Sequence, residues 1–253
     1  KSGEKNKNLK ACHSIWKQLI NHNFDRNSLI INLGGGIIGD IGGFCASTYK
    51  RGIDFIHIPT TLLAMVDAAI GGKSAVNLNN LKNQIGVFQN PSSVIINTDF
   101  LNTLPKKEII SGFAEIVKHA LIADKNLWQK IYKNFFEKLD LKEIIGISIE
   151  LKNKIILNDP EEKGERKKLN FGHTFGHAIE SYYLEKRTPI LHGEAIFIGI
   201  ILETELSILS KSEKNEIKNY ILSNFKLPYT PPKLEILKFL KNDKKNKNNK
   251  INF

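Results

Sequence analysis

The pattern of apolar residues changes near Leu104-Pro105, and this change limits the folds that the chain can adopt. Before it lie three short apolar segments of the kind that forms buried strands in a parallel sheet, at 28–33, 55–59 and 94–98. Helical periodicity lies between them, for example around 60–69. Strands that alternate with helices predict an α/β domain over residues 1–104.

Beyond residue 104, the apolar residues follow a helical period and strand patterns are absent. Helices are expected over 106–123, 126–139, 141–157, 168–184, 194–210 and 213–225. The sequence therefore predicts an all-helical second domain over 105–253. No internal repeat is visible in either part.

Composition describes a globular chain with a substantial core: 253 residues, of which 41% are hydrophobic and 25% charged. No apolar run approaches the roughly 20 residues that cross a bilayer, and the first ten residues are polar, so neither a membrane partner nor a signal peptide is expected. Cys12 and Cys45 are too few for a disulfide framework, which favours a cytoplasmic location. The single methionine is Met65, so we expect the true N-terminus to be missing.

The net charge of +11 comes mainly from lysines that occur together with asparagine and isoleucine. The densest basic run, 241–250, contains no aromatic residue, whereas nucleic-acid surfaces combine clustered arginine and lysine with aromatic side chains. We therefore expect no nucleic-acid partner. A basic cleft for a small anion remains open.

A glycine-rich turn follows the first expected strand. Gly34, Gly36 and Gly39 fit the GxGxxG pattern between a strand and a helix, where backbone N–H groups can hold a pyrophosphate. The alternative is a tight strand–helix turn without a ligand. The pair Gly42-Gly43 and the loop Thr60-Thr61 favour a dinucleotide. Asp54 does not stand where the usual ribose-binding acid would, so this is not a standard Rossmann opening.

Several charged and amide side chains near this turn could hold a phosphate or a carboxylate. They stand in an expected loop that is hinged at Gly71-Gly72, where small residues surround them. The members of this group are Asp67, Lys73, Lys82 and Asn83, and Arg51 precedes an expected strand.

The segment 112–119 (GFAEIVKH) places Glu115 and Lys118 three residues apart on one helical face among apolar neighbours. An ordinary surface ion pair has the same spacing. Because the neighbours predict partial burial, and a buried carboxylate needs a cation or a metal, Glu115 is a candidate oxygen ligand. His119 is a rival ligand that the spacing does not exclude.

Three histidines cluster beside glycines in the segments LNFGHTFGHAIE and LHGEA. His173 and His177 are four residues apart and project from one helical face, and His192 stands in a Gly-flanked turn. About three protein ligands and an open position make a catalytic metal site, so these histidines and a carboxylate predict one. Arg166 and Asn170 lead into His173 one turn apart and are expected to face the same pocket.

Taken in order, the glycine turn, VDAAIGGK, GFAEIVK, GHTFGH and LHGE resemble the 3-dehydroquinate synthase family of sugar phosphate cyclases. The resemblance implies an N-terminal Rossmann-like NAD-binding domain, here truncated at its start, and a helical domain that holds Zn²⁺, with Co²⁺ as an alternative. It places the active site between the two domains and implies a homodimer.

The resemblance also implies roles for individual residues. The metal ligands would be Glu115, His173 and His192. The residues that contact NAD would be Glu4, Lys7, Gly36, Ile37, Ile38, Gly39, Asp40, Thr60, Thr61, Lys73, Lys82, Phe100, Leu101, Asn102 and Thr103. The substrate-binding and proton-transfer residues would be Asp67, Lys73, Asn83, Lys118, Lys152, Glu162, Arg166, Asn170 and His177, with a lysine at 244 or 245. Arg51 would reach the site of a neighbouring subunit.

The implied reaction converts 3-deoxy-D-arabino-heptulosonate 7-phosphate to 3-dehydroquinate and phosphate, a carbon–oxygen lyase step of the shikimate pathway to aromatic amino acids. It combines transient oxidation by NAD, β-elimination of phosphate, reduction and an aldol cyclisation. The alternatives are another cyclase such as 2-deoxy-scyllo-inosose synthase, or a metal-dependent polyol or glycerol-phosphate dehydrogenase. A remnant without activity and a basic interaction module are the non-enzymatic alternatives.

Overall fold

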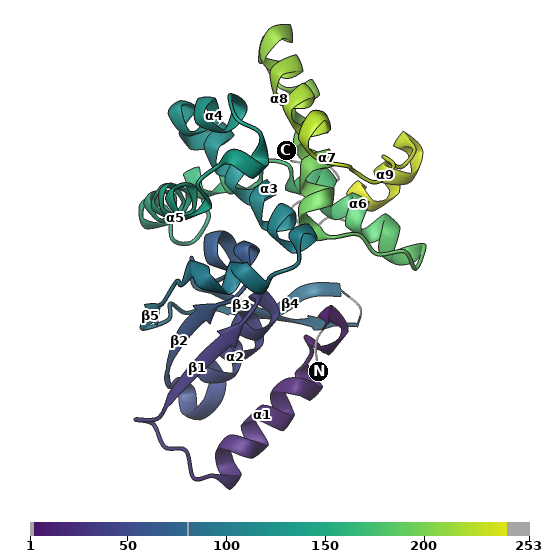
Figure 1. Ribbon diagram of the computed structural model, residues 1–253. Helices are drawn as coiled ribbons and strands as arrows, with labels where there is room; N and C mark the ends of the chain where they lie inside the picture. The colour runs from purple at the N-terminus through teal and green to yellow at the C-terminus, as the bar shows by residue number, and fades with distance from the viewer. Residues whose placement is uncertain (1–2, 80, 242–253) are drawn as a thin grey trace. The chain divides into compact units, whose positions relative to one another are not determined.

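The polypeptide divides after Pro105, next to the change in sequence pattern, into unit 1 (Lys1–Pro105) and unit 2 (Lys106–Phe253). The computed structural model describes residues 3–79 and 81–241 (Figure 1). The basic run 241–250, beyond its first residue, and the lysines at 244 and 245 lie outside the described residues. Within the described ranges, no helix is long and apolar enough to span a bilayer.

Unit 1 is built on a parallel sheet of β1 (Leu29–Gly34), β2 (Asp54–Pro59) and β5 (Ser93–Val94), in the order β1-β2-β5. Helix α2 (Gly36–Thr48) connects β1 to β2 and packs on the sheet (Figure 1). The expected α/β arrangement is confirmed. The third strand is shorter than the predicted 94–98, because Asn97 accepts a hydrogen bond from the Asp99 backbone and starts a 3₁₀ segment, η4 (Thr98–Thr103).

The prediction that β1 is a buried strand is wrong for one of its faces. Leu29, Ile31 and Leu33 are 44%, 58% and 57% exposed. On the opposite face, Asn32 is buried against α2 at Gly42, where a Cβ would lie 1.7 Å from the Asn32 Oδ1. On β1, therefore, the face toward α2 is buried at Asn32, whereas the opposite face is exposed among the described residues.

The loop expected around Gly71-Gly72 is largely an antiparallel hairpin of β3 (Lys73–Leu78) and β4 (Leu81–Phe88). Val76 on β3 is fully buried and packs with Ile41, Phe44 and Cys45 of α2. The Gly- and Lys-rich sequence masked this alternation of buried and exposed residues. The remaining elements of unit 1 are η1 (Glu4–Asn6), α1 (Leu9–Asn21), which sequence analysis did not predict, η2 (Tyr49–Arg51) and the single-turn π-helix η3 (Ala64–Ala68).

Unit 2 is helical throughout its described part, as the sequence predicts. Its longer helices are α3 (Lys106–Ala123), α4 (Lys125–Tyr132), α5 (Leu141–Asn158), α6 (His173–Glu185), α7 (His192–Leu206), α8 (Lys211–Asn224) and α9 (Lys233–Lys241), with 3₁₀ segments η5 (Phe136–Lys138) and η6 (Glu165–Asn170).

Three predicted helices are wrong in their bounds, and one of them, 194–210, ends at Leu206. The segment 126–139 is helical only as far as Tyr132, because Phe136 turns inward in η5 and packs edge-on against Phe113 at a centroid distance of 4.8 Å. The segment 168–184 is interrupted at Gly172, whose φ of 79° is left-handed, so η6 ends before α6 begins. Helix α9 was not predicted.

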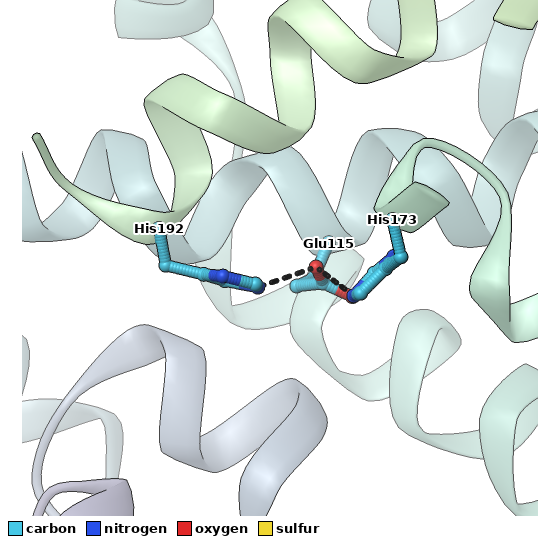
Figure 2. Close-up of side chains that lie close together, drawn as sticks. All are labelled: Glu115, His173 and His192. Carbon is cyan, nitrogen blue, oxygen red and sulfur yellow. Dashed lines mark ion pairs between the residues drawn. The ribbon is translucent and has the colours of Figure 1, made fainter. Parts of the chain in front are cut away.

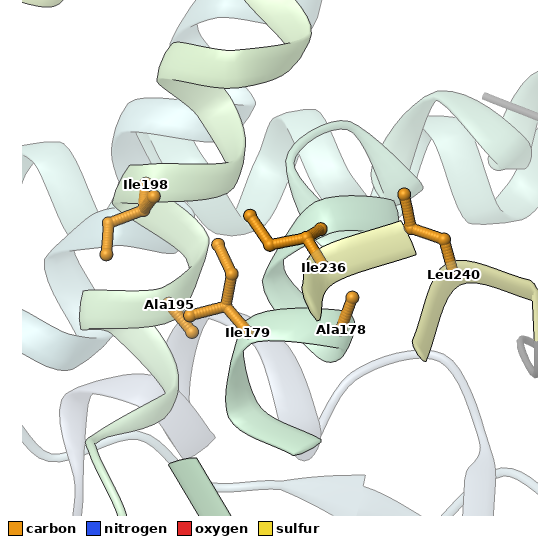
Figure 3. Close-up of a cluster of buried hydrophobic side chains, with 6 residues drawn as sticks. All are labelled: Ala178, Ile179, Ala195, Ile198, Ile236 and Leu240. Atoms are coloured by element: carbon orange, nitrogen blue, oxygen red, sulfur yellow. The ribbon is translucent and has the colours of Figure 1, made fainter. Parts of the chain in front are cut away.

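One buried hydrophobic cluster of unit 2 joins α6, α7 and α9 (Figure 3). Its buried side chains are Ala178, Ile179, Ala195, Ile198, Ile236 and Leu240. Helix α7 is apolar on nearly all sides, which is typical of a helix that other helices surround. It contacts α3, α6 and α8 and is therefore the central element of this unit.

Glycines allow α7 to approach its neighbours at backbone distance. A Cβ added at Gly199 would lie 1.9 Å from the carbonyl oxygen of Gly172 and 2.9 Å from the backbone nitrogen of Gly176. A Cβ at Gly193 would lie 2.1 Å from the carbonyl oxygen of Ser111 on α3. The glycines beside the clustered histidines therefore set the spacing of α3, α6 and α7.

We predict that Gly199→Ala destabilises the protein by about 3 kcal/mol or more, since the added methyl group meets backbone atoms that cannot move aside as a side chain would. The control is Gly146→Ala on α5, where no described atom lies within 4 Å and the higher helix propensity of alanine should stabilise by about 0.5–1 kcal/mol. Urea unfolding measures both. Equal midpoints for the two variants would contradict the proposed packing role of Gly199.

Candidate metal centre

Among the described residues of unit 2, Glu115 is the most deeply buried carboxylate, with 0% of its residue surface exposed. It lies on α3, and its Oε2 accepts a hydrogen bond from the ammonium of Lys118 one turn later, as their spacing predicts. Burial by itself raises the pKa of Glu115, but Lys118 and the nearby histidines hold this pKa well below its ordinary value. The side chain is therefore a carboxylate in a dry environment.

Two histidines approach the other oxygen of this carboxylate from two further helices (Figure 2). Oε1 of Glu115 lies 3.5 Å from Nε2 of His173, at the start of α6, and 3.4 Å from Nε2 of His192, at the start of α7. The three residues offer ligand atoms that all lie within 4.8 Å of one another. His192 thus begins a helix, and the Gly-flanked turn expected for it is wrong.

These distances fit a divalent metal ion. Bonds of about 2.0–2.1 Å to nitrogen and oxygen place tetrahedral ligand atoms about 3.3–3.4 Å apart. Oε1 of Glu115 has no hydrogen-bond partner among the described residues, which is unusual for a buried carboxylate oxygen. A cation between the three side chains would satisfy this oxygen.

The backbone fixes the tautomer that His173 needs for this role. Its Nδ1 lies 3.2 Å from the carbonyl oxygen of Phe171, which can only accept a hydrogen bond. Nδ1 therefore carries the proton, and Nε2 presents its lone pair toward Glu115. Burial, followed by the charge of Lys118, lowers the pKa of His173 well below its ordinary value, so the ring is neutral.

His192 lies between two carboxylates. Its Nε2 faces Glu115, and its Nδ1 lies 3.5 Å from Oε1 of Glu180 on α6. Burial lowers the pKa of His192, but Glu180 and then Glu115 raise it to about 10. Without a metal this ring carries a proton on each nitrogen, and a cation bound at Nε2 would replace one of them.

The start of α6 is held by a carboxylate that sequence analysis missed. Glu203, 8% exposed on α7, accepts hydrogen bonds from the backbone N–H groups of Gly172 (2.7 Å), Thr174 (3.1 Å) and Phe175 (3.3 Å). These donors have no partner inside the helix, and their partial positive charge favours an anion. A lone acid in the apolar run IFIGIILE was the available sequence signal.

The other two histidine candidates differ in their surroundings. His177 is exposed, and its ring lies 5.3 Å from that of His173 and 6.4 Å from that of His192, centroid to centroid. His119, the rival ligand, is fully buried, and its Nδ1 lies 2.7 Å from Oγ of Ser148 on α5.

Three of the predicted substrate-binding residues of unit 2, Lys152, Arg166 and Asn170, lie on α5 and η6, which contact each other. Arg166 is buried and donates to the carbonyl oxygen of Pro160 at 2.5 Å, and Asn170 donates to Oε1 of Glu162 at 2.7 Å. Asp159 shapes this loop by accepting bonds from three backbone N–H groups, among them that of Arg166. Lys152 on α5 is also buried.

In unit 1, the glycine turn and the loop after β2 lie side by side. The backbone nitrogen of Thr60 donates to the carbonyl oxygen of Gly34 at 3.0 Å. A Cβ at Gly35 would lie 3.1 Å from Thr61, and a Cβ at Gly36 would lie 3.1 Å from Ala68. The N-terminus of α2, which begins at Gly36, therefore stands at the carboxyl edge of the sheet.

A polar network connects several predicted cofactor and substrate residues of unit 1. The buried ammonium of Lys7 bonds to Asp40 of α2 and to Oδ1 of Asn83 on β4, the latter at 2.6 Å. Asn77 accepts from the backbone of Asn83 and donates to Oε1 of Glu4, both at 2.9 Å. Asn77 was not predicted, and no sequence signal marked it.

The structure places the other predicted residues of unit 1 on several further elements. Arg51, in η2, follows the far end of α2, about 20 Å from the glycine turn for a helix of 13 residues. Asp67 lies in η3, Lys73 begins β3, and Lys82 lies on β4. The segment Phe100–Thr103 belongs to η4, where Leu101 is buried.

Two family models match the chain in succession. The N-terminal model of 3-dehydroquinate synthase matches residues 1–111, and the C-terminal model matches residues 112–246. The chain belongs to the 3-dehydroquinate synthase family.

Curated members of the 3-dehydroquinate synthase family are similar over most of this chain. The enzyme of Parabacteroides distasonis is 47% identical over 209 residues, which are 81% of this chain and 59% of that protein. Those of Prochlorococcus marinus (strain MIT 9312) and Pelagibacter ubique are 44% and 42% identical over 100% and 99% of this chain. The chain spans 73% and 72% of those two relatives.

Solved structures of related cyclases have the same fold. A 2-deoxy-scyllo-inosose synthase complexed with carbaglucose-6-phosphate, NAD⁺ and Co²⁺ is 28% identical, with a TM-score of 0.83 over 96% of this chain and 70% of that one. A 2-epi-5-epi-valiolone synthase from Streptomyces hygroscopicus, with NAD⁺ and Zn²⁺ bound, is 26% identical, with a TM-score of 0.83 over 95% and 70%.

We predict that Glu203→Ala destabilises the protein by about 2–3 kcal/mol, because it leaves buried N–H groups without an acceptor and removes the anion at the start of α6. Glu203→Gln keeps an accepting oxygen and should cost less. The control is Glu205→Gln on the same helix, whose exposed ion pair with Lys218 is worth less than about 1 kcal/mol. Denaturant unfolding, monitored by circular dichroism, measures the stability of each variant. Equal stabilities of Glu203→Ala and Glu205→Gln would contradict the role of Glu203 at the start of α6.

Proposed function

We propose that the protein to which this chain belongs is a 3-dehydroquinate synthase, a carbon–oxygen lyase that converts 3-deoxy-D-arabino-heptulosonate 7-phosphate to 3-dehydroquinate and phosphate. The observation that carries the proposal is the convergence of Glu115, His173 and His192 from three helices in a chain that both family models match. Relatives with this name at 42–47% identity support it.

We propose that Glu115, His173 and His192 hold a divalent metal, Zn²⁺ or Co²⁺, through Oε1 and the two Nε2 atoms. The unpartnered buried oxygen, the distances of 3.4 and 3.5 Å and the neutral His173 support this ligand set. The cyclases with bound Co²⁺ and Zn²⁺ support the choice of metal. The backbone bond of His173 leaves Nε2 as its ligating atom.

We propose that unit 1 binds NAD at the glycine turn. The free N–H groups at the start of α2 are suited to a pyrophosphate, and the adjoining loop Thr60-Thr61 offers hydroxyl groups. The network of Glu4, Lys7 and Asp40 fixes the position of the segment before α1. The NAD⁺ in both cyclase structures supports this site.

When bound, NAD takes and returns a hydride, and the metal withdraws electron density from a substrate oxygen. The chain's own residues would bind and orient an anionic sugar phosphate. Arg166 and Lys152 supply positive charge, and the amide of Asn170, positioned by Glu162, supplies a donor. His177 is exposed beside His173, where its imidazole can take up or release a proton.

Two further parts of the proposal concern the location and the assembly of the protein. A cytoplasmic location agrees with the two thiols, Cys12 and Cys45, which are both free. The homodimer, with Arg51 reaching a neighbouring subunit, rests on the family resemblance.

For the full-length gene product loaded with Zn²⁺, we predict phosphate release from 3-deoxy-D-arabino-heptulosonate 7-phosphate with catalytic amounts of NAD and no net NADH. A coupled phosphate assay and absorbance at the NADH band measure both. Net NADH formation from a polyol would instead support the dehydrogenase alternative. Turnover of glucose 6-phosphate alone would support an inosose synthase.

We predict that His173→Ala and His177→Ala separate two roles within one helix. His173→Ala should lose bound Zn²⁺, because the set would keep only two protein ligands. His177→Ala should keep Zn²⁺ and lower kcat by about 10²–10⁴, the usual contribution of a proton-transfer group. Elemental analysis and steady-state kinetics check this. Loss of the metal from both variants would contradict the division.

A further inference from the structure

Glu180 has no role in the function proposed above, yet it lies beside the metal centre. It stands on α6 seven residues after His173 and three after His177, so all three lie on one face of that helix. Its side chain is 11% exposed, and its Oε1 lies 3.5 Å from Nδ1 of His192. A carboxylate from one histidine-bearing helix therefore meets the histidine of the next.

The imidazole of His192 lies between two carboxylates that approach different ring nitrogens. Nε2 lies 3.4 Å from Oε1 of Glu115, and Nδ1 lies 3.5 Å from Oε1 of Glu180. A metal-bound imidazole uses one nitrogen as the ligand and keeps a proton on the other, which commonly donates to a carboxylate or a carbonyl. The ring thus has one nitrogen for each purpose.

We propose that Glu180 is a positioning residue of the metal centre: it accepts the Nδ1–H of His192 and so directs Nε2 of that ring toward Glu115 and His173. This inference rests on the metal site proposed above.

The comparison with His173 strengthens the argument. The Nδ1 of His173 lies 3.2 Å from the carbonyl oxygen of Phe171, so the backbone orients that ring. His192 is the first residue of α7, and no backbone carbonyl of the described residues orients its ring in this way. Glu180 stands where such an acceptor is needed, and it adds a negative charge that strengthens the ligand.

The same geometry argues against Glu180 as a fourth ligand. An ion bound at Nε2 lies on the side of the ring that faces Glu115, whereas Glu180 lies on the Nδ1 side. Removal of Glu180 should therefore weaken metal binding without abolishing it.

The test compares Zn²⁺ affinities of the full-length gene product and its variants by competition with a chromophoric chelator, with metal as the only probe. Glu180→Ala should bind Zn²⁺ about 10–100-fold more weakly than the wild type. Glu180→Gln keeps an accepting oxygen and should lose less than about tenfold. The matched control is Glu185→Ala, an exposed carboxylate at the end of the same helix, which should not change the affinity.

A purely structural role would lower the stability of the metal-free protein and leave the affinity of its folded fraction unchanged. Urea unfolding without metal therefore accompanies each titration. Unchanged affinity in a folded Glu180→Ala would overturn the inference, and complete loss of binding would make Glu180 a ligand instead. A wild type that binds no Zn²⁺ would overturn the metal centre itself.

If Glu180→Ala does not fold, spectra of the wild type and of Glu180→Gln test the inference instead. Nitrogen-15 spectra of the Zn²⁺-loaded protein distinguish a protonated from a metal-bound ring nitrogen. A protonated Nδ1 of His192 whose resonance shifts in folded Glu180→Gln supports the inference. Metal at Nδ1, or no shift in Glu180→Gln, overturns it.

Discussion

The negative charge of a carboxylate that is removed from water must be balanced by cations or hydrogen-bond donors. In unit 2, Glu115 is such a carboxylate. Lys118 compensates one oxygen from the same helix, while the other faces two imidazoles from α6 and α7. An isolated buried charge of this kind would cost several kcal/mol. The helices that carry the histidines must therefore stay where they can supply partners, and the packing of unit 2 serves this requirement.

That packing depends on small residues more than on large ones. Gly199 lies against Gly172 and Gly176, and Gly193 lies against Ser111, so α7 approaches both neighbours at backbone distance. When side chains of ordinary size lie between two helices, the helix axes are about 8–10 Å apart. The glycines that flank the histidines in the sequence are thus part of the site, although they contribute no functional group.

Sequence patterns predicted the helices of unit 2 well because their apolar period is long and regular, as for α3, whose bounds are those expected. They failed where a single residue overrides the period. Gly172 stops one helix through its left-handed backbone, and Phe136 leaves another to fill the core. The hairpin β3–β4 was missed because glycine and lysine hide the alternation that Val76 and Ser74 carry.

The candidate ligands could be found in the sequence, since histidine spacing and a carboxylate among apolar residues leave a local signal. Spacing alone did not choose between His119, His173, His177 and His192, because that choice depends on which ring nitrogens meet Oε1 of Glu115 in space. Glu180 and Glu203 carried no signal strong enough to predict them. Their partners are a ring nitrogen and backbone N–H groups on another helix, which no local pattern encodes.

The cap that Glu203 forms has a consequence for thermal motion. Helix α7 carries His192 at its first residue and Glu203 three turns later, and Glu203 is bonded to the backbone on either side of His173. A displacement of α7 therefore moves one imidazole directly and draws the other along with it. The separation of the two rings should fluctuate less than the position of either ring, so the site can keep its dimensions while the surrounding helices move.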